Sequence, residues 1–454
     1  MLKLTVCRNL FYVTFLVLLV ACGGSSSTFD NQPDDNNSSQ VTSLHPLSWN
    51  IATPEEVGMN SSLLKEAFDY AFEDGTFSQA ALVIKDGNLV YEQYRGITDN
   101  EASILASTSS SNSDVNFYKN LLGQRDSNNL VSSWSTAKSF TSFLIGIAEE
   151  SGYINSIHDP AAEYINEWSM DERSSITIKD LLDMRSGLVP ICFNFSEYEL
   201  GECQNSNDAS SGGNIIYAND QLTKCINRGF ATDGVTHPWY ENGSSIYTRG
   251  SFQYSNCDTM VLGEIIFRAT GQDIQTYGDY NLFSKINMEA FWWRDYESSG
   301  QSNGNYLAYC CLDSTARDFA KFGYMLLLGG IYEEGITKYS KYVDSIRNLE
   351  SYGLQFWTIC PEQQTYTGCD NSIISTIGFD GQYIIIDFEK NIIIVRNSLY
   401  EPVLNLSQDR KMKLNPTSLS MSNWTATAPR AMGSSSDTSF NPINFYNLII
   451  KSIN

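Results

Sequence analysis

Residues 132–150 read SSWSTAKSFTSFLIGIAEE, a polar turn followed by an apolar run. The spacing of the apolar residues predicts a helix with one buried face, and these residues are Ala137, Phe140, Leu144, Ile147 and Ala148. Lys138 follows Ser135 by three positions, so the two side chains share one face of that helix. A lysine at the entrance of a buried helix needs a reason, because an ammonium group is costly to bury.

The spacing Ser-x-x-Lys offers one such reason, which is nucleophilic catalysis. Burial lowers the pKa of a lysine, so Lys138 could act as a neutral base that takes the proton of Ser135. The positive potential of the helix N-terminus would favour the developing negative charge. The same spacing also occurs at Ser62 and Lys65, on a segment where the lysine can point to solvent. The motif alone therefore leaves open an ordinary helix serine with a solvent-directed lysine.

A tyrosine that shares the proton with the lysine would complete such a site. The pattern Tyr-x-Asn begins at Tyr118, Tyr153, Tyr164, Tyr217, Tyr240 and Tyr254. Tyr254 leads directly into a helical pattern at residues 258–272, which makes it the best placed to be held rigidly. The alternative is a tyrosine that only packs at a helix start.

The stretch GFDGQYIIID, residues 378–387, places two glycines before a strand pattern. Glycines there allow a ligand to approach the backbone closely, and the strand edge could donate an N–H to an oxyanion together with the N–H of Ser135. The alternative is a glycine-marked bulge. A G-x-S-x-G match at residues 300–304 lies in a polar loop rather than between a strand and a helix, so it predicts no nucleophile elbow.

Strand patterns lie towards both ends of the chain. Residues 80–96 predict a hairpin around Asp86-Gly87, and residues 382–388 and 392–399 predict two further strands. Helical patterns occupy residues 61–75, 176–188 (ended by Gly187), 258–272 and 314–330, whereas the polar residues 97–131 predict a long surface loop. The order predicts an α+β fold, with an antiparallel sheet from the two ends flanked by helices and a mostly helical region, about residues 160–310, inserted between them.

The first 22 residues resemble a bacterial lipoprotein signal peptide. Lys3 and Arg8 precede a short apolar run that ends in LVAC at Cys22. The resemblance implies that Cys22 carries lipid and anchors the protein to the cell envelope outside the cytoplasm, at the outer membrane; plain secretion is the alternative. Residues 23–46 are polar and predict a flexible tether, so the folded domain is expected at residues 47–454.

Composition excludes some classes of function. The chain has 52 acidic and 29 basic residues and a net charge of -23, which argues against nucleic-acid binding. Eight cysteines follow Cys22, and in an exported protein they predict disulfides, with Cys192–Cys203 and Cys360–Cys369 as the expected local pairs. The three histidines are scattered, and zinc-protease, P-loop and dinucleotide motifs do not occur, so neither a metal nor an organic cofactor is expected.

Taken in order, these segments resemble serine hydrolases of the β-lactamase/penicillin-binding-protein superfamily, and most closely the branch that is similar to 6-aminohexanoate-dimer hydrolase. The resemblance covers about Ala80 to Ser398. It implies an acyl-enzyme mechanism in which Ser135 is the nucleophile, Lys138 the general base and Tyr254 the proton relay. It further implies that Asn256 orients the substrate or the lysine and that the backbone of Gln382 contributes to the oxyanion hole.

One departure from the superfamily bears on the substrate. Its β-lactamases carry a Lys-Thr-Gly-like triplet on the sheet edge, where this chain has Phe379-Asp380-Gly381. The loss of the cation and the gain of Asp380 favour a small ester or amide over a β-lactam. A peptidoglycan-directed DD-peptidase or muropeptide hydrolase is the first alternative. A surface binding protein on the same fold is the second. The sequence does not give the oligomeric state.

Overall fold

The computed structural model describes residues 45–108, 114–189, 215, 220–230, 250–295, 304–362, 365, 373–399 and 440–454. All of these residues belong to one compact unit, Ser43–Asn454. His45 is buried and accepts the N–H of Tyr332. The fold therefore begins by His45, whereas the tether was predicted to extend to residue 46.

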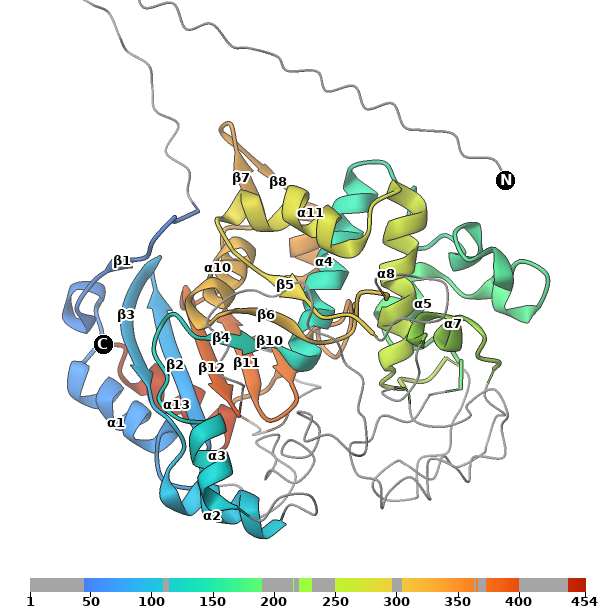
Figure 1. Ribbon diagram of the computed structural model, residues 1–454. Coiled ribbons are helices and arrows are strands. Elements are labelled where there is room, and N and C mark those ends of the chain that lie inside the picture. The colour runs from blue at the N-terminus through green and yellow to red at the C-terminus, as the bar shows by residue number, and fades with distance from the viewer. Residues whose placement is uncertain are drawn as a thin grey trace, which may run out of the picture. The chain divides into compact units, whose positions relative to one another are not determined.

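Strands from both ends of the described chain form one large sheet (Figure 1). Within the described residues it has the order β1-β3-β2-β12-β11-β10-β9. The strands are β1 (Asn50–Ile51), β2 (Ser78–Lys85), β3 (Asn88–Tyr94), β9 (Trp357–Ile359), β10 (Ile373–Gly378), β11 (Gln382–Asp387) and β12 (Ile392–Ser398). All neighbours are antiparallel except β1, which pairs parallel to β3. The predicted hairpin, the two C-terminal strands and the predicted fold class are confirmed.

The pairing of β2 with β12 joins the two ends of the chain in the middle of the sheet. Both strands are buried along their whole length, which explains the uninterrupted apolar runs at residues 80–84 and 392–395. On one face, Val83 belongs to a core with α1 (Ser61–Ala71) and α13 (Pro442–Lys451). On the other face, Leu82 belongs to the main core, which contains residues of α4 and α10.

The remaining helices lie between the strands in sequence. They are α2 (Asp99–Thr108), α3 (Val115–Leu121), α4 (Ala137–Glu150), α5 (Ile178–Leu182), α7 (Gln221–Ile226), α8 (Asn256–Thr270), α9 (Ile274–Gly278), α10 (Ala316–Leu327) and α11 (Ser340–Arg347). A small sheet combines β4 (Leu130–Ser132), β6 (Leu312–Thr315) and β5 (Phe291–Trp292), and β7 (Ile331–Glu333) pairs with β8 (Ile336–Lys338). Within the described residues, no helix is long and apolar enough to cross a membrane.

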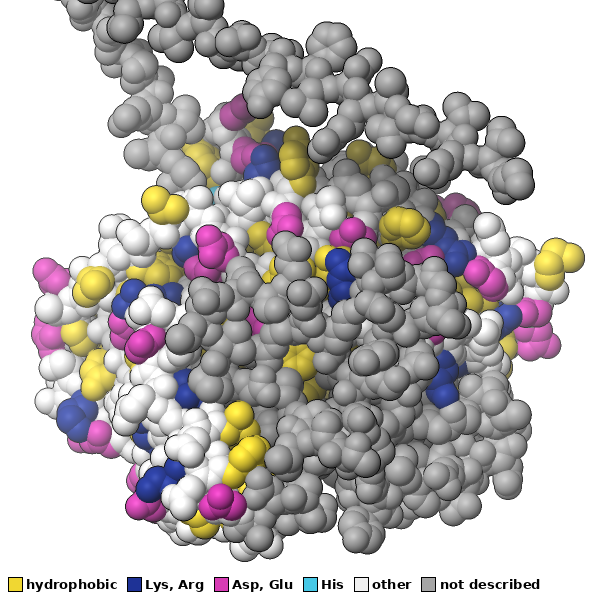
Figure 2. All heavy atoms as spheres, in the orientation of Figure 1, with side chains coloured by type: hydrophobic (Ala, Val, Ile, Leu, Met, Phe, Trp, Pro, Cys, Tyr) yellow, Lys and Arg dark blue, Asp and Glu magenta, His cyan; other side chains and the backbone are white. Residues whose placement is uncertain are grey.

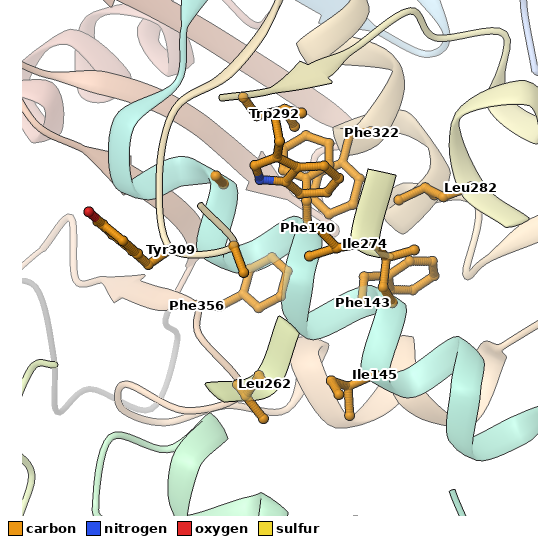
Figure 3. Packing of buried hydrophobic residues seen from close by; sticks show 14 of the residues in the cluster. Phe140, Phe143, Ile145, Leu262, Ile274, Leu282, Trp292, Tyr309, Phe322 and Phe356 are labelled. Atoms are coloured by element: carbon orange, nitrogen blue, oxygen red, sulfur yellow. The ribbon is translucent and has the colours of Figure 1, made fainter. Parts of the chain in front are cut away.

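Helix α4 is buried from Ala137 to Ala148, on all of its faces. Figure 3 shows Phe140 and Phe143 inside a cluster to which Trp292 and Phe322 contribute. The rings of Phe140 and Phe322 stack with their centroids 3.8 Å apart. Aromatic pairs of this kind add to the free energy gained by burying apolar area. The helix that carries Lys138 is therefore fixed rigidly in the core.

The prediction of a surface loop at residues 97–131 is wrong. This stretch forms α2, α3 and β4. Several of its apolar side chains form a separate small core with Phe77 and Leu399 from outside the stretch; these are Ala102, Leu105, Ala106, Tyr118 and Leu122. The buried carboxylate of Glu101 accepts the backbone N–H of Phe77 and pairs with Arg95. Abundant serine and asparagine concealed this helical pattern.

Two further expectations change in detail. Helix α5 ends at Leu182, five residues before Gly187, which was expected to end it. Two disulfides join described cysteines, Cys225–Cys257 and Cys310–Cys311, and neither pair was predicted. Cys360 is disulfide-bonded, but its expected partner Cys369 and the predicted pair Cys192–Cys203 lie outside the described residues. Most of the G-x-S-x-G match also lies outside them.

The charged side chains are mixed on the face that Figure 2 shows. Its lysine and arginine side chains lie apart from one another, among aspartate and glutamate side chains. The described part of this face thus presents no continuous basic patch of the kind that phosphate backbones require.

Gly146 on α4 tests how tightly this helix is packed. A Cβ atom at this position would lie 2.4 Å from Cγ of the buried Tyr342, so Gly146→Ala must displace that ring. Overpacking costs about 1–3 kcal/mol, which exceeds the gain of about 1 kcal/mol from removing a helical glycine. We expect a net loss in the free energy of unfolding, measured by urea denaturation. Gly229→Ala, where a Cβ meets nothing within 4 Å, should change it by less than about 0.5 kcal/mol. Equal effects would show that Tyr342 yields freely.

Candidate active site

Ser135 lies in a short 3-10 turn, Trp134–Thr136, between β4 and α4. The backbone of Trp134 is left-handed, with φ 47°, a conformation that a bulky residue adopts only where its surroundings enforce it. Those surroundings come from residues 311 and 312. The N–H of Cys311 donates to the carbonyl of Trp134 (3.3 Å), and Ser133 exchanges hydrogen bonds with Leu312 at 2.9 and 3.0 Å.

Lys138 is 1% exposed at the first turn of α4. Its amine lies 3.0 Å from Oγ of Ser135, 2.7 Å from Oδ1 of Asn256 and 2.8 Å from the carbonyl oxygen of Tyr309. The structure thus brings the predicted nucleophile, base and orienting asparagine together, although Asn256 is 118 residues further along the chain. The other Ser-x-x-Lys match is different, because Lys65 is exposed and pairs with Asp69.

Burial lowers the pKa of Lys138 well below the ordinary value for a lysine. The amine lies against two aromatic rings, 4.9 Å from the centroid of Tyr254 and 5.4 Å from that of Tyr309. Both tyrosines have a raised pKa because their hydroxyls are removed from water, and a hydrogen bond with Ser135 partly offsets this rise for Tyr254. The environment therefore favours a neutral amine beside neutral phenols.

The start of α8 positions Tyr254 and Asn256. Ser255 caps the helix by accepting the N–H of Asp258. The buried guanidinium of Arg228 donates to the carboxylate of Asp258 (2.9 Å) and to the hydroxyl of Ser255 (3.0 Å). This ion pair is fully removed from solvent, so losing either partner would leave an uncompensated buried charge. It fixes the helix end from which Asn256 reaches Lys138.

Aromatic rings surround Tyr254. The rings of Tyr254 and Trp357 lie with centroids 5.8 Å apart, and Tyr352 packs on Trp357 at 4.8 Å. Near the serine, Trp134 contacts Phe379 edge-on at 5.7 Å. Of these residues, only Tyr254 was predicted as a site residue. Within the described residues, aromatic rings therefore pack against Tyr254 and against the turn that carries Ser135.

The turn between β10 and β11 contains Asp380 and Gly381, both with positive φ. Gly378, at the end of β10, packs so closely on the turn before Ser135 that a Cβ would lie 2.3 Å from the carbonyl oxygen of Ser133. The hydroxyl of Thr136 donates to the carbonyl of Gln382 (3.1 Å). The predicted strand edge thus packs directly against the serine turn, and only glycine permits this approach.

A buried cation stabilises the same turn. Arg396 on β12 is 1% exposed, and its guanidinium donates to the carbonyls of Asp380 (3.2 Å) and Gly381 (2.9 Å). Burial lowers its pKa to about 10. Its other donors go to Ser78 and to the carbonyl of Thr76. Two hydrogen bonds of the guanidinium therefore go to carbonyls of this turn.

The predicted lipidation site, Cys22, lies outside the described residues. Within the part of the chain that the structure describes, no cluster of three or more His, Cys, Asp or Glu side chains could hold a metal ion. Tyr309 was not predicted, because it acts through its backbone carbonyl and such a contact leaves no mark on the side-chain sequence.

The sheet with helices on both faces is the architecture of the β-lactamase fold. A family model described as Beta-lactamase matches residues 68–404. The chain therefore belongs to the β-lactamase family, as the sequence resemblance indicated. This membership makes it a relative of serine hydrolases, and it leaves the reaction open.

One curated relative is the 6-aminohexanoate-dimer hydrolase of Paenarthrobacter ureafaciens, which is 25% identical over 275 residues. The match covers 58% of this chain and only 64% of that protein. The chain therefore spans less than two thirds of the length of this relative.

Among the solved structures that share the fold, two illustrate the likeness. A protein from Bacteroides dorei assigned as a β-lactamase superposes with a TM-score of 0.53 at 14% identity and covers 87% of this chain and 99% of its own. A penicillin-binding-protein homologue from Pyrococcus abyssi gives 0.50 at 17% identity, with 75% and 74% covered. At these identities the likeness concerns the fold alone.

The lowered pKa of Lys138 predicts a pH-dependent stability. Between the folded pKa and the unfolded value of about 10.4, the unfolded chain binds more protons than the folded protein, so raising the pH stabilises the fold. We expect the free energy of unfolding of wild type, relative to Lys138→Met, to rise across this window in urea titrations. The control is Lys65→Met, because the pKa of the exposed Lys65 is raised by its hydrogen bond to Asp69. A flat difference for Lys138→Met would mean that the amine is charged when folded.

Proposed function

We propose that the protein is an exported serine hydrolase that cleaves a small ester or amide through an acyl-enzyme on Ser135. The observation that carries this proposal is the buried amine of Lys138, 3.0 Å from Oγ of Ser135. Structural roles do not account for it, since a methionine would fill the same space without the cost of burying an amine. An activated serine does account for it.

The two other contacts of the Lys138 amine determine where its lone pair points. A neutral amine has two N–H groups and one lone pair. When the N–H groups go to Asn256 and to the carbonyl of Tyr309, the lone pair is left for the hydroxyl of Ser135. In this arrangement Lys138 takes the serine proton as Oγ attacks the carbonyl carbon.

The later steps use the remaining groups. The negative charge that develops on the substrate oxygen would be stabilised by the backbone N–H groups of Ser135 and Gln382, whose segments are joined through Thr136. The phenol of Tyr254, kept neutral by burial, would pass a proton to the leaving group. Water activated by the same base then releases the acyl group from Ser135.

The surroundings of the site favour an uncharged substrate. The triplet Phe379-Asp380-Gly381 carries no cation, and the nearby Arg396 is buried against the carbonyls of that turn. Instead, aromatic rings lie beside the site residues: Trp357 packs on Tyr254, and Phe379 packs on Trp134 of the serine turn. The likeness to a protein named 6-aminohexanoate-dimer hydrolase fits the hydrolysis of a small substrate as well.

Export and lipid anchoring through Cys22 belong to the same proposal. The disulfides Cys225–Cys257 and Cys310–Cys311 support an oxidising compartment, because such bonds rarely persist in the cytoplasm. The small-molecule substrate then has to reach the envelope, and the net charge of -23 gives nucleic acid no part in the function.

A fluorophosphonate probe tests the nucleophile. We expect wild type to gain one adduct by intact mass and to turn over p-nitrophenyl acetate, and Ser135→Ala to lose both, with kcat/KM down by at least about 1,000-fold. Ser62→Ala is the matched control, since Ser62 begins the exposed Ser-x-x-Lys match. A folded wild-type protein that neither labels nor turns over ester would refute the proposal and favour a binding protein.

The proton relay is tested by Tyr254→Phe, which removes the phenol and keeps the ring. We expect kcat to fall by about 100- to 10,000-fold, as for other lost general acids, while KM changes little. Tyr153→Phe is the control, because Tyr153 begins another Tyr-x-Asn pattern and is 51% exposed. Steady-state kinetics on the same ester would measure both. A Tyr254→Phe enzyme with wild-type kcat would assign the relay to Lys138 alone.

A further inference from the structure

A disulfide joins the neighbouring residues Cys310 and Cys311. Both cysteines are buried, at 1% and 0% exposure. A disulfide stabilises a protein mainly by closing a loop in the unfolded chain, and a bond between adjacent residues closes no such loop. This bond therefore needs a local explanation.

The bond lies in a strap, which we define as residues 309–312. At its first residue, the carbonyl of Tyr309 accepts the amine of Lys138 at 2.8 Å. At its third, the N–H of Cys311 donates to the carbonyl of Trp134, the residue before the nucleophile. The disulfide ring joins Cys310, which lies between these two contacts, to Cys311, which makes the second one.

The last residue of the strap extends the contact with the serine turn. Leu312 receives the N–H of Ser133 on its carbonyl (2.9 Å) and donates its own N–H to the hydroxyl of Ser133 (3.0 Å). The strap thus touches the base at one end and the nucleophile turn at the other. A shift of the strap would move both groups relative to each other.

The strap also holds an unfavourable backbone conformation. Cys311 has φ 64°, in the left-handed region that a residue with a Cβ rarely occupies. A covalent ring between Cys310 and Cys311 restricts the torsions of the peptide that joins them. Without the ring, the strap could relax to a commoner conformation and withdraw the carbonyl of Tyr309 from Lys138.

We infer that Cys310 and Cys311 are positioning residues: their disulfide holds the carbonyl of Tyr309 where it orients the Lys138 amine, and the N–H of Cys311 where it fixes the turn that carries Ser135. This inference rests on the proposed function. The disulfide acts through the strap and does not touch the substrate. It is formed before catalysis and is unchanged by it.

The second disulfide offers a contrast within the same protein. Cys225–Cys257 links α7 to α8 across 32 residues, so it constrains the unfolded chain far more. Cys257 also follows a residue that holds the amine, Asn256. The start of α8, however, is fixed independently by the Arg228–Asp258 ion pair. Removing this disulfide should reduce stability and leave the lysine in place.

The test compares two double variants of the full chain, Cys310→Ser/Cys311→Ser and Cys225→Ser/Cys257→Ser, produced by export and checked for disulfides by intact mass. The rate of fluorophosphonate labelling at Ser135 and the kcat and KM for p-nitrophenyl acetate are measured across pH, together with Tm. For the strap variant we expect kcat to fall about 10- to 100-fold with KM changed less than about threefold.

The pH profile separates positioning from general damage. Among the residues that the structure describes, the titratable side chains that face the amine are Tyr254 and Tyr309. If the strap relaxes and water reaches the amine, the pKa of Lys138 rises towards its ordinary value. The acid limb of kcat/KM and of labelling should then move to higher pH in the strap variant, with little change in Tm. The Cys225–Cys257 variant should show the opposite, a Tm lower by several degrees and an unmoved acid limb.

Each outcome decides the inference. An unmoved acid limb and a wild-type kcat in the strap variant would overturn it, while wild-type labelling at Ser135 would leave the proposed function standing. A wild-type protein that neither labels nor turns over ester would refute both. If the double variant does not fold, Cys310→Ser alone opens the same ring and is measured in its place. A loss of kcat with an unmoved acid limb would indicate structural damage and overturn the inference.

Discussion

The amine of Lys138 is the constraint on which the rest of the site depends. An amine that is 1% exposed costs free energy unless acceptors surround it, and here they come from segments far apart in the chain. Ser135 lies in the 3-10 turn just before α4, Asn256 is the first residue of α8, and Tyr309 lies in the strap. The fold brings these segments to one point, and the apolar packing of α4 offsets the unfavourable burial. Burial of Lys138 therefore lowers the free energy of unfolding, and the packing of the remaining core compensates for this loss.

The serine turn is held from two sides. On one side, the strap hydrogen-bonds to the backbone of Ser133 and Trp134. On the other, the β10–β11 hairpin packs through Gly378 and accepts the hydroxyl of Thr136 at Gln382. The second contact exists only because β12 pairs with β2 and thereby brings the C-terminal hairpin into the same sheet as the N-terminal one. The left-handed backbone of Trp134 is the local consequence of this double restraint.

Local signals in the sequence were enough for much of this architecture. The Asp86-Gly87 turn, the apolar run of α4 and the helical pattern at residues 258–272 are each local signals, and the Ser135–Lys138 spacing follows from helix geometry. The helices at residues 97–131 were missed because their small core, around Tyr118 and Leu122, is completed by Phe77 and Leu399 from other parts of the chain. Contacts of that range are not visible in a local pattern.

The same distinction between local and long-range signals applies to the residues of the site. Tyr254 could be selected because it immediately precedes a helix. The carbonyl of Tyr309 could not, since any residue type offers a carbonyl. The adjacent cysteines are plain in the sequence, but eight cysteines allow many pairings, and adjacency alone favours none of them. The functional role that we infer for the Cys310–Cys311 bond depends on the hydrogen bonds that the strap makes to Lys138 and to the serine turn, and these are visible only in the structure.

One environment sets the protonation states of the base and of the proton donor together. Desolvation disfavours charge, so it lowers the pKa of Lys138 and raises the pKa of Tyr254. Both groups are therefore neutral in the resting site, one with a lone pair to accept a proton and the other with a hydroxyl to donate one. A carboxylate beside the amine would have raised the lysine pKa and removed the base. In the proposed mechanism, charge appears only when the proton leaves Ser135, next to the backbone N–H groups that can stabilise the resulting oxyanion.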